Sequence, residues 1–251
     1  MSEPFYGSRL KIERAKQHIN NLHEMILAFA VDSYVLSVHS DGKIGYDVVQ
    51  VDTAKSLPDN FALVIGDALH NLKSALDFIV NEVVFRRLGY YDDFTRFPFR
   101  KTRNDLVAAV NGGLIHQASK AVADFIVDVV KPYNGGNDAL WALHDLNILD
   151  KHRLLLPFMQ ITAVHDILAE DDRGEKISIG TWVITNNRTA IYPCVGHSNV
   201  KITNKGKSAF LVLFDQGLPL ESKAVIPHLK QMAELVSGVV EGIETVFAGE
   251  E

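Results

Sequence analysis

A stripe of short polar side chains follows one face of a helix that the sequence predicts between residues 66 and 81. Its members are Asp67, His70, Asn71, Ser74, Asp77 and Asn81, and the opposite face of the helix is apolar. A solvated helix face usually carries long Lys and Glu side chains. Short side chains of this kind instead build hydrogen-bond networks or line a site. Together with Lys73, the stripe is one half of a candidate site.

The other half lies in residues 140–156, which predict a second helix. This segment is apolar on every side, as buried helices are, yet it carries His144, Asp145, Asn147, Asp150, Lys151, His152 and Arg153. Buried charges need partners. The stripe could supply them, for example Asp67 or Asp77 facing a cation of the second helix. A closed ion-pair network and an active site would both meet this requirement.

Metal-independent acid–base chemistry fits these residue types best. A histidine can exchange the proton, a lysine or arginine can stabilise charge on phosphorus, and an aspartate can orient the imidazole. Such a set is sufficient to cleave RNA, because the 2′-hydroxyl is the nucleophile. The candidate catalytic residues are His70, Asp77, His144, Asp150, Lys151, His152 and Arg153. The candidate binding residues are Asp67, Asn71, Lys73, Ser74, Asn147, Arg100 and Arg103.

Other chemistries find little support in the sequence. His70 and Asp77 are too far apart along one helix to share an ion, and Asn147 would be a poor transition-metal ligand. The sequence has neither a Gly-x-Ser-x-Gly elbow nor a glycine loop of a phosphate cradle or dinucleotide site. We therefore predict no metal and no cofactor.

Residues 86–103 combine basic and aromatic side chains. The segment contains Arg86, Arg87, Tyr90, Tyr91, Phe94, Arg96, Phe97, Phe99, Arg100, Lys101 and Arg103, against Asp92 and Asp93. Such a composition can bind single-stranded nucleic acid. It is also typical of a loop that its aromatic residues hold against the core.

Both helix motifs resemble those of a widespread, functionally uncharacterised bacterial family. The matching residues are Gly66, Asp67, His70, Asn71, Leu72, Ser74, Ala75, Leu76 and Asp77, then Asn147, Asp150, Lys151, His152 and Arg153. Phe97-Pro98-Phe99 and Lys131-Pro132-Tyr133 are further landmarks, so the resemblance covers about residues 9–157. Lys73 replaces an arginine of the family pattern, and Phe78 replaces a histidine.

The resemblance implies no activity, so whether the chain is an enzyme stays open. A looser similarity, of architecture only, connects it with the helical-bundle HEPN ribonucleases. Their Arg-x4-6-His motif has no clean copy near residues 144–153. The alternative to RNA cleavage is a binding or structural protein in which the same residues form a buried network. That alternative expects His152→Ala to cost several kcal/mol.

The composition indicates an ordinary globular protein. The 251 residues include 25 Lys and Arg against 31 Asp and Glu, giving a net charge of −6, which disfavours non-specific binding of nucleic acid. Cys194 is the single cysteine, so no disulfide can form within the chain. Since no apolar run is long enough to span a bilayer, we expect a cytoplasmic protein without membrane contacts.

The pattern of elements predicts an α+β fold. Residues 1–157 are expected to form a helical bundle with a hairpin insertion at 33–52, whose turn lies at Asp41-Gly42. Helices are predicted at 9–31, from 60 to Gly89, at 117–131 and at 138–156. Residues 158–251 are expected to form an antiparallel sheet closed by a last helix at 227–248, packed as one unit with the bundle.

The first and last predicted helices both carry apolar seams with spacings of three and four residues. Such seams bury themselves against another helix. They would pair with each other, or one would face a second subunit. A homodimer through the terminal helices is therefore one predicted assembly.

Overall fold

The computed structural model describes residues 4–30, 34–41, 45–53, 56–90, 94–183 and 190–250. The chain is an α+β protein of helices and small antiparallel sheets, divided into two compact units. The helical unit comprises residues 1–22, 59–156 and 214–251. The sheet unit comprises residues 23–58 and 157–213. Among the described residues, no helix is both long and apolar enough to cross a membrane.

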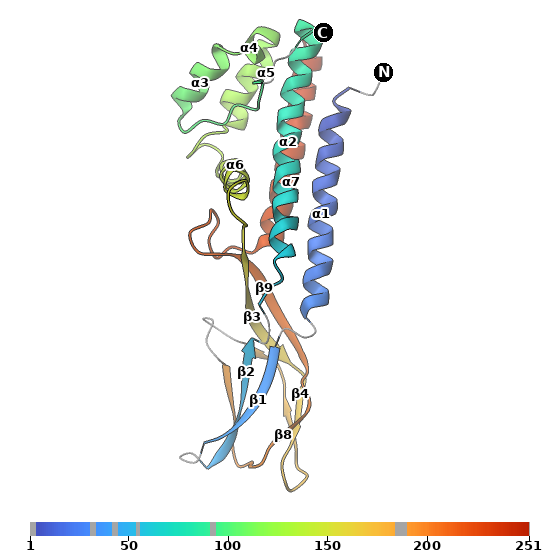
Figure 1. The fold of residues 1–251 in the computed structure, drawn as a ribbon, viewed down its shortest axis with the longest axis vertical. Coiled ribbons are helices and arrows are strands. Elements are labelled where there is room, and N and C mark those ends of the chain that lie inside the picture. Colours follow the sequence, from blue (N-terminus) through green and yellow to red (C-terminus); the bar gives the residue numbers. More distant parts are fainter. Residues whose placement is uncertain are drawn as a thin grey trace. The chain divides into compact units, whose positions relative to one another are not determined.

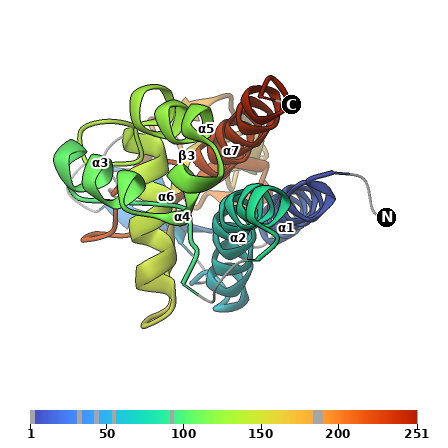
Figure 2. The same ribbon diagram turned by 90° about the horizontal axis from the view of Figure 1, so that it is seen from above.

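The helical unit is built around a long central helix, α2, which contacts α4, α6 and α7. Its helices are α1 (Tyr6–Ala30, to Leu22 in this unit), α2 (Asn60–Leu88), α3 (Arg103–Asn111), α4 (Leu114–Ala118), α5 (Lys120–Phe125), a π-helical turn (Ile126–Val130), α6 (Asp138–Asp150) and α7 (Val225–Ala248). Figure 1 shows α1, α2 and α7 running in nearly the same direction, and Figure 2 shows α3, α4 and α5 grouped near α6.

The two terminal helices pair within the chain. Arg9 on α1 donates to Glu244 on α7 at 2.8 Å, and Lys16 lies 3.4 Å from Glu234. The apolar seams of both helices are buried, as Ile12, Ile19 and Leu22 are on α1. The seams therefore do not require a second subunit to cover them.

The long helix α2 confirms the predicted apolar face and the predicted end. Ile65, Leu69, Leu72 and Leu76 are fully buried. Gly89 ends the helix in the left-handed region at φ 75°, and its N–H donates to the carbonyl oxygen of Phe85 at 2.8 Å. Because these buried residues occupy one side of α2, only the opposite side can contribute side chains to a functional site.

The sheet unit contains three small sheets. Their strand orders are β1 (Tyr34–Asp41), β2 (Tyr46–Thr53) and β7 (Ala190–Cys194); β6 (Trp182–Val183), β3 (Pro157–His165) and β9 (Lys207–Phe214); and β5 (Lys176–Ile179), β4 (Ile167–Glu170) and β8 (Lys201–Asn204). The predicted hairpin of β1 and β2 is antiparallel, as expected. Gly42, in its predicted turn, lies outside the described residues.

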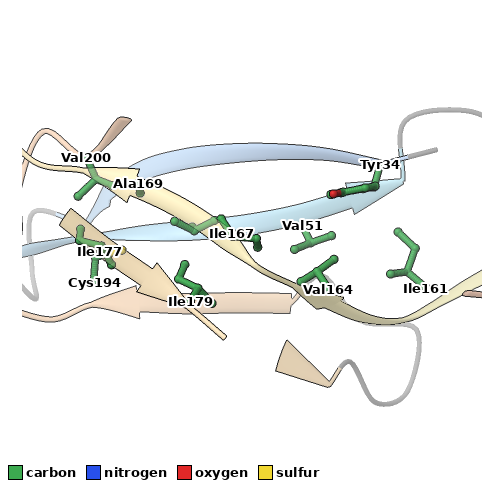
Figure 3. Close-up of a cluster of buried hydrophobic side chains, with 11 residues drawn as sticks. Tyr34, Val51, Ile161, Val164, Ile167, Ala169, Ile177, Ile179, Cys194 and Val200 are labelled. Atoms are coloured by element: carbon green, nitrogen blue, oxygen red, sulfur yellow. The ribbon is translucent and has the colours of Figure 1, made fainter. Parts of the chain in front are cut away.

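Side chains from all three sheets fill one apolar core (Figure 3). Val49 and Val51 come from β2, Val164 from β3, and Ile167 and Ala169 from β4, each less than 5% exposed. Because successive side chains of a strand point to opposite faces, alternate residues of β2 and β4 enter this core.

The chain passes from the helical unit to the sheet unit after residue 156, close to the predicted boundary at 157 and 158, but the hairpin and the last helix belong to other units than predicted. The hairpin belongs to the sheet unit, because β2 pairs with β7 over Asp47 to Val51. The last helix belongs to the helical unit, because α7 packs on α2, α5 and α6. Both pairings join segments far apart in sequence, which local patterns do not reveal.

Two predicted helices have different bounds in the structure. The predicted helix 117–131 is interrupted at Ser119, whose hydroxyl accepts a hydrogen bond from Val122 N and so starts a new helix, α5. The predicted helix 138–156 ends at Asp150, six residues early. There the N–H groups of His152 and Arg153 both donate to the Leu149 carbonyl oxygen, and the chain then extends into β3 at Pro157.

Candidate functional site

A partly open cleft of about 310 Å³ lies in the helical unit between α2 and α6. Its lining is His70, Lys73, Ser74 and Asp77 from α2; Arg96, Phe97, Phe99 and Arg100 from the segment before α3; and His144, Asn147, Ile148 and Lys151 from α6 and its C-cap. Eight of these residues belong to the predicted site. The cleft therefore joins the two sequence motifs and adds a third segment.

Each helix presents one narrow stripe to the cleft. The lining positions are 70, 73, 74 and 77 on α2, and 144, 147, 148 and 151 on α6 and its C-cap. Both sets follow the i, i+3, i+4, i+7 spacing. Residues so spaced lie on one face of an α-helix. Because α2 and α6 pack against each other, the two stripes meet across the cleft.

The third wall is the segment 94–100, which its aromatic residues hold in place. Phe97 and Phe99 are buried, and their rings lie 5.2 Å apart between centroids. Arg100 N–H donates to the Pro132 carbonyl oxygen at 3.2 Å. Arg96 and Arg100 flank these two phenylalanines in the sequence, and both arginines are exposed and line the cleft. The basic–aromatic composition thus serves both anchoring and lining.

Asp77 is the single carboxylate among the described residues that line the cleft, and two donors already use it. Its Oδ1 accepts from Lys73 Nζ at 2.6 Å and from the backbone N–H of Phe97 at 2.8 Å. It therefore positions a lysine and the third wall rather than an imidazole, which differs from the role predicted for it.

Lys73 lies deep in the cleft, with its side chain only 13% exposed. Burial lowers its pKa, the Asp77 carboxylate opposes that shift, and Lys151 and Arg96 reinforce it. The ammonium also sits 5.3 Å from the Phe99 ring centroid, within the range of a cation–π contact.

The pKa of His144 is lowered by burial and by the cationic side chains of the cleft. Burial, followed by the charges of Lys73 and Lys151, lowers its pKa to about 4. Its ring stacks on Phe99 and touches Trp141, with centroids 4.5 Å and 5.3 Å away. Its Nδ1 is buried and has no hydrogen-bond partner in the described parts of the chain. At neutral pH the cleft therefore holds an uncharged imidazole.

Three of the four basic side chains in the cleft lack a carboxylate partner among the described residues. Arg96 and Arg100 donate to the backbone carbonyl oxygens of Thr95 and Phe99 at 2.8 and 2.7 Å. Lys151 is exposed and forms no ion pair with any described residue. The cleft thus concentrates positive charge, although the whole chain is acidic.

Several predicted site residues lie outside the cleft lining. Asp67 is exposed on α2, and Asn71 is buried beside it, where it accepts from Lys11 at 3.2 Å and donates to the Asp67 carbonyl oxygen at 2.8 Å. Arg103 pairs with Asp128 at 2.7 Å on the exposed surface of α3. Asn71 and Arg103 thus connect elements of the helical unit rather than lining the cleft.

His152 and Arg153 are also outside it. Both are exposed in the turn after α6, while Lys151, one residue earlier, lines the cleft. Neither side chain pairs with Asp67 or Asp77, contrary to the ion pairs predicted between the two motifs. The helix ends at Asp150, so the predicted face of a longer helix does not extend to them.

Asp150 serves the packing of the two helices. A β-carbon at Gly66 would overlap the Asp150 carboxylate, so the missing side chain lets α6 approach α2. Burial and the neighbouring Asp67 raise the pKa of Asp150, while His70 lowers it. The close approach of α6 therefore requires a glycine at position 66. This explains why Gly66 of the first motif accompanies Asp150 of the second.

A separate cluster in the sheet unit brings together Asp171, Glu175 and His197, whose ligand atoms lie within 4.8 Å of one another. The Arg173 guanidinium already bridges the two carboxylates, at 2.8 and 3.0 Å, and His197 Nδ1 lies 3.0 Å from Asp171. Hydrogen bonds from His197 and Arg173 lower the pKa of Asp171. The cluster is a closed ion-pair network that ties a turn together.

Arg96, Phe97, Phe99 and Ile148 line the cleft without being among the predicted site residues. The repeated i, i+3, i+4, i+7 spacing from His70 and from His144 is the signal that separates the lining residues from their neighbours. Comparison with protein-family models, with curated proteins and with solved structures gives no match for this chain. The geometry of the cleft is therefore the basis for a functional proposal.

Proposed function

We propose that the cleft binds a phosphate group and that the chain cleaves a phosphodiester bond of RNA without a metal ion. The observation that carries this proposal is the excess of cations in the cleft. Lys73, Arg96, Arg100 and Lys151 line it against one carboxylate, which Lys73 already engages. Guanidinium and ammonium groups are the usual partners of phosphate oxygens.

The neutral imidazole of His144 gives the cleft a proton acceptor. In the proposed reaction the 2′-hydroxyl oxygen attacks phosphorus, its proton passes to His144, and the 5′-oxygen leaves with a proton supplied by His70. Arg96, Arg100 and Lys151 stabilise the charge that builds up on phosphorus. The products are a 2′,3′-cyclic phosphate and a 5′-hydroxyl end, so the protons balance.

Phosphate binding would also tune this acceptor. The cationic neighbours that lower the pKa of His144 are those that a bound phosphate would neutralise. Its pKa would then rise toward neutrality, where a general base is most effective. In the free cleft the imidazole is a weak base, which equally supports a protein that binds phosphate without turnover.

Matched variants test phosphate binding. Lys151 and Arg153 are neighbouring exposed cations, but only Lys151 lines the cleft. We expect Lys151→Ala to weaken the binding of inorganic phosphate by about fivefold to tenfold, measured by calorimetry. Arg153→Ala should leave it unchanged. Equal losses in both variants would show non-specific attraction and contradict the proposal.

A second pair tests turnover. A labelled single-stranded RNA is incubated with the protein and EDTA, and the cyclic phosphate product is measured. We expect His144→Phe to lose at least about a hundredfold in rate, whereas His152→Ala keeps it. Phosphate binding by the wild-type protein without any cleavage would leave the non-catalytic binding protein as the function.

The resemblance to a bacterial family and the composition support a bacterial origin and a cytoplasmic location. A homodimer would have to use faces other than the seams of α1 and α7, because the seam residues are already buried within the chain. Light scattering at several concentrations distinguishes a monomer from a dimer.

A further inference from the structure

A second hollow adjoins the cleft and shares two residues with it. It has a volume of about 290 Å³ and lies within the helical unit. Its lining is Phe94, Thr95, Arg96, Pro98, Arg100, Ala109, Gly112, Gly113, Leu114, Ile115 and Gln117. Arg96 and Arg100 line both spaces, so these two residues are common to the cleft and the second hollow.

The rim of this hollow carries a highly exposed aromatic side chain. Phe94 is 89% exposed, the largest value among the exposed large apolar side chains of the described residues. An aromatic ring offered to solvent beside guanidinium groups is a surface on which a nucleobase can stack. Gly112 and Gly113 add no side chains to the lining, which leaves space beside the ring.

The sizes of the two spaces limit what each can hold. Both are near the lower end of the range of small-molecule sites, roughly 300–1,000 Å³. Each therefore fits one fragment of a ligand rather than a whole large one. The cleft offers four cationic side chains, whereas the second hollow adds the apolar side chains of Phe94, Pro98 and Leu114 to polar ones such as Gln117.

We infer that the second hollow binds the base of a nucleotide whose phosphate occupies the cleft. This inference rests on the proposed function and specifies its substrate as single-stranded RNA. The phosphate lies against Arg96 and Arg100 on the cleft side, and the adjoining base stacks on Phe94 on the other side. Stacking accepts any base, so the site selects single strands rather than a sequence.

The test compares three probes: inorganic phosphate, a short 2′-fluoro oligouridylate that cannot be cleaved, and an abasic oligomer of the same length and charge. We expect Phe94→Ala to weaken oligouridylate binding about tenfold, measured by fluorescence anisotropy. Binding of phosphate and of the abasic oligomer should not change. Phe94→Trp should restore the affinity for oligouridylate.

Two further variants keep the test independent of one substitution. Ala109→Phe fills the hollow from a half-buried position on α3 and should also weaken oligouridylate binding. Phe85→Ala removes an exposed phenylalanine that lines neither space and should have no effect. If Phe94→Ala and Ala109→Phe both bind oligouridylate like wild type, while phosphate still binds, the base site is overturned and the proposed function stands. If wild type binds no phosphate, both are overturned.

Discussion

The imidazole of His144 lies flat against the ring of Phe99, with centroids 4.5 Å apart and planes inclined by 7°. This stack joins α6 to the segment that carries Arg96 and Arg100. It places a neutral, buried nitrogen without a described partner among cationic side chains. Such an arrangement is costly for the fold and useful for a proton acceptor.

The first prediction separates a functional role of His144 from a structural one. His144→Phe keeps a ring against Phe99 and removes the buried nitrogen that lacks a described partner. We expect the free energy of unfolding to stay equal or rise by about 1 kcal/mol, while RNA cleavage is lost. Urea denaturation measures the stability. A loss of several kcal/mol would instead assign His144 to a structural network.

The second prediction concerns the pH dependence of stability. His144 titrates near 6.5 in an unfolded chain and near 4 in the folded protein. Between these values the unfolded chain binds the additional proton, so stability falls as the pH drops from 6.5 to 4 and is unaffected by this group above 6.5. Across this window wild type should lose on the order of 2 kcal/mol more than His144→Phe. Identical pH profiles would contradict the buried, cation-surrounded imidazole.

The third prediction concerns Asp77, which binds Lys73 and the backbone N–H of Phe97. Asp77→Ala should cost about 1–3 kcal/mol, because it leaves both donors without their acceptor. Asp77→Asn should cost less, since the amide oxygen can still accept from Phe97 N. Thermal unfolding of the two variants measures the difference. Equal costs would mean that the backbone bond contributes nothing.

The fourth prediction compares two helical glycines. Gly66→Ala would push against the Asp150 carboxylate and should cost about 1–3 kcal/mol, although alanine favours helices. At Gly238, on the exposed side of α7, a new β-carbon meets nothing within 4 Å. Gly238→Ala should therefore stabilise by about 0.5–1 kcal/mol. Stabilisation at both positions would contradict the close approach of α2 and α6.

The helices and the hairpin could be predicted because local patterns encode them. The apolar spacing on α2, the glycine that ends it and the alternation in β1 and β2 depend on neighbours in sequence. The placement of the hairpin with β7, and of α7 with α2, depends on contacts between distant segments. No local pattern reports such contacts.

The parts of the candidate site on the two helices could be predicted from the sequence, but the residues beyond the helix ends could not. The sequence indicates His70, Lys73, Asp77, His144 and Lys151, because polar or charged side chains on apolar helices require partners. The same reasoning extends to His152 and Arg153 only if the helix continues beyond Asp150, where it ends. The sequence alone does not place Arg96, because its position depends on Phe97 and Phe99 anchoring a loop against another helix.

The most direct test of the central claim follows the His144 imidazole by NMR during a pH titration, with and without inorganic phosphate. The spectrum of His144→Phe assigns the signal. In the free protein the pKa should be near 4, and saturating phosphate should raise it by about one unit or more, because it neutralises Lys73, Lys151 and Arg100. A titration curve unchanged by phosphate would contradict the proposed phosphate site.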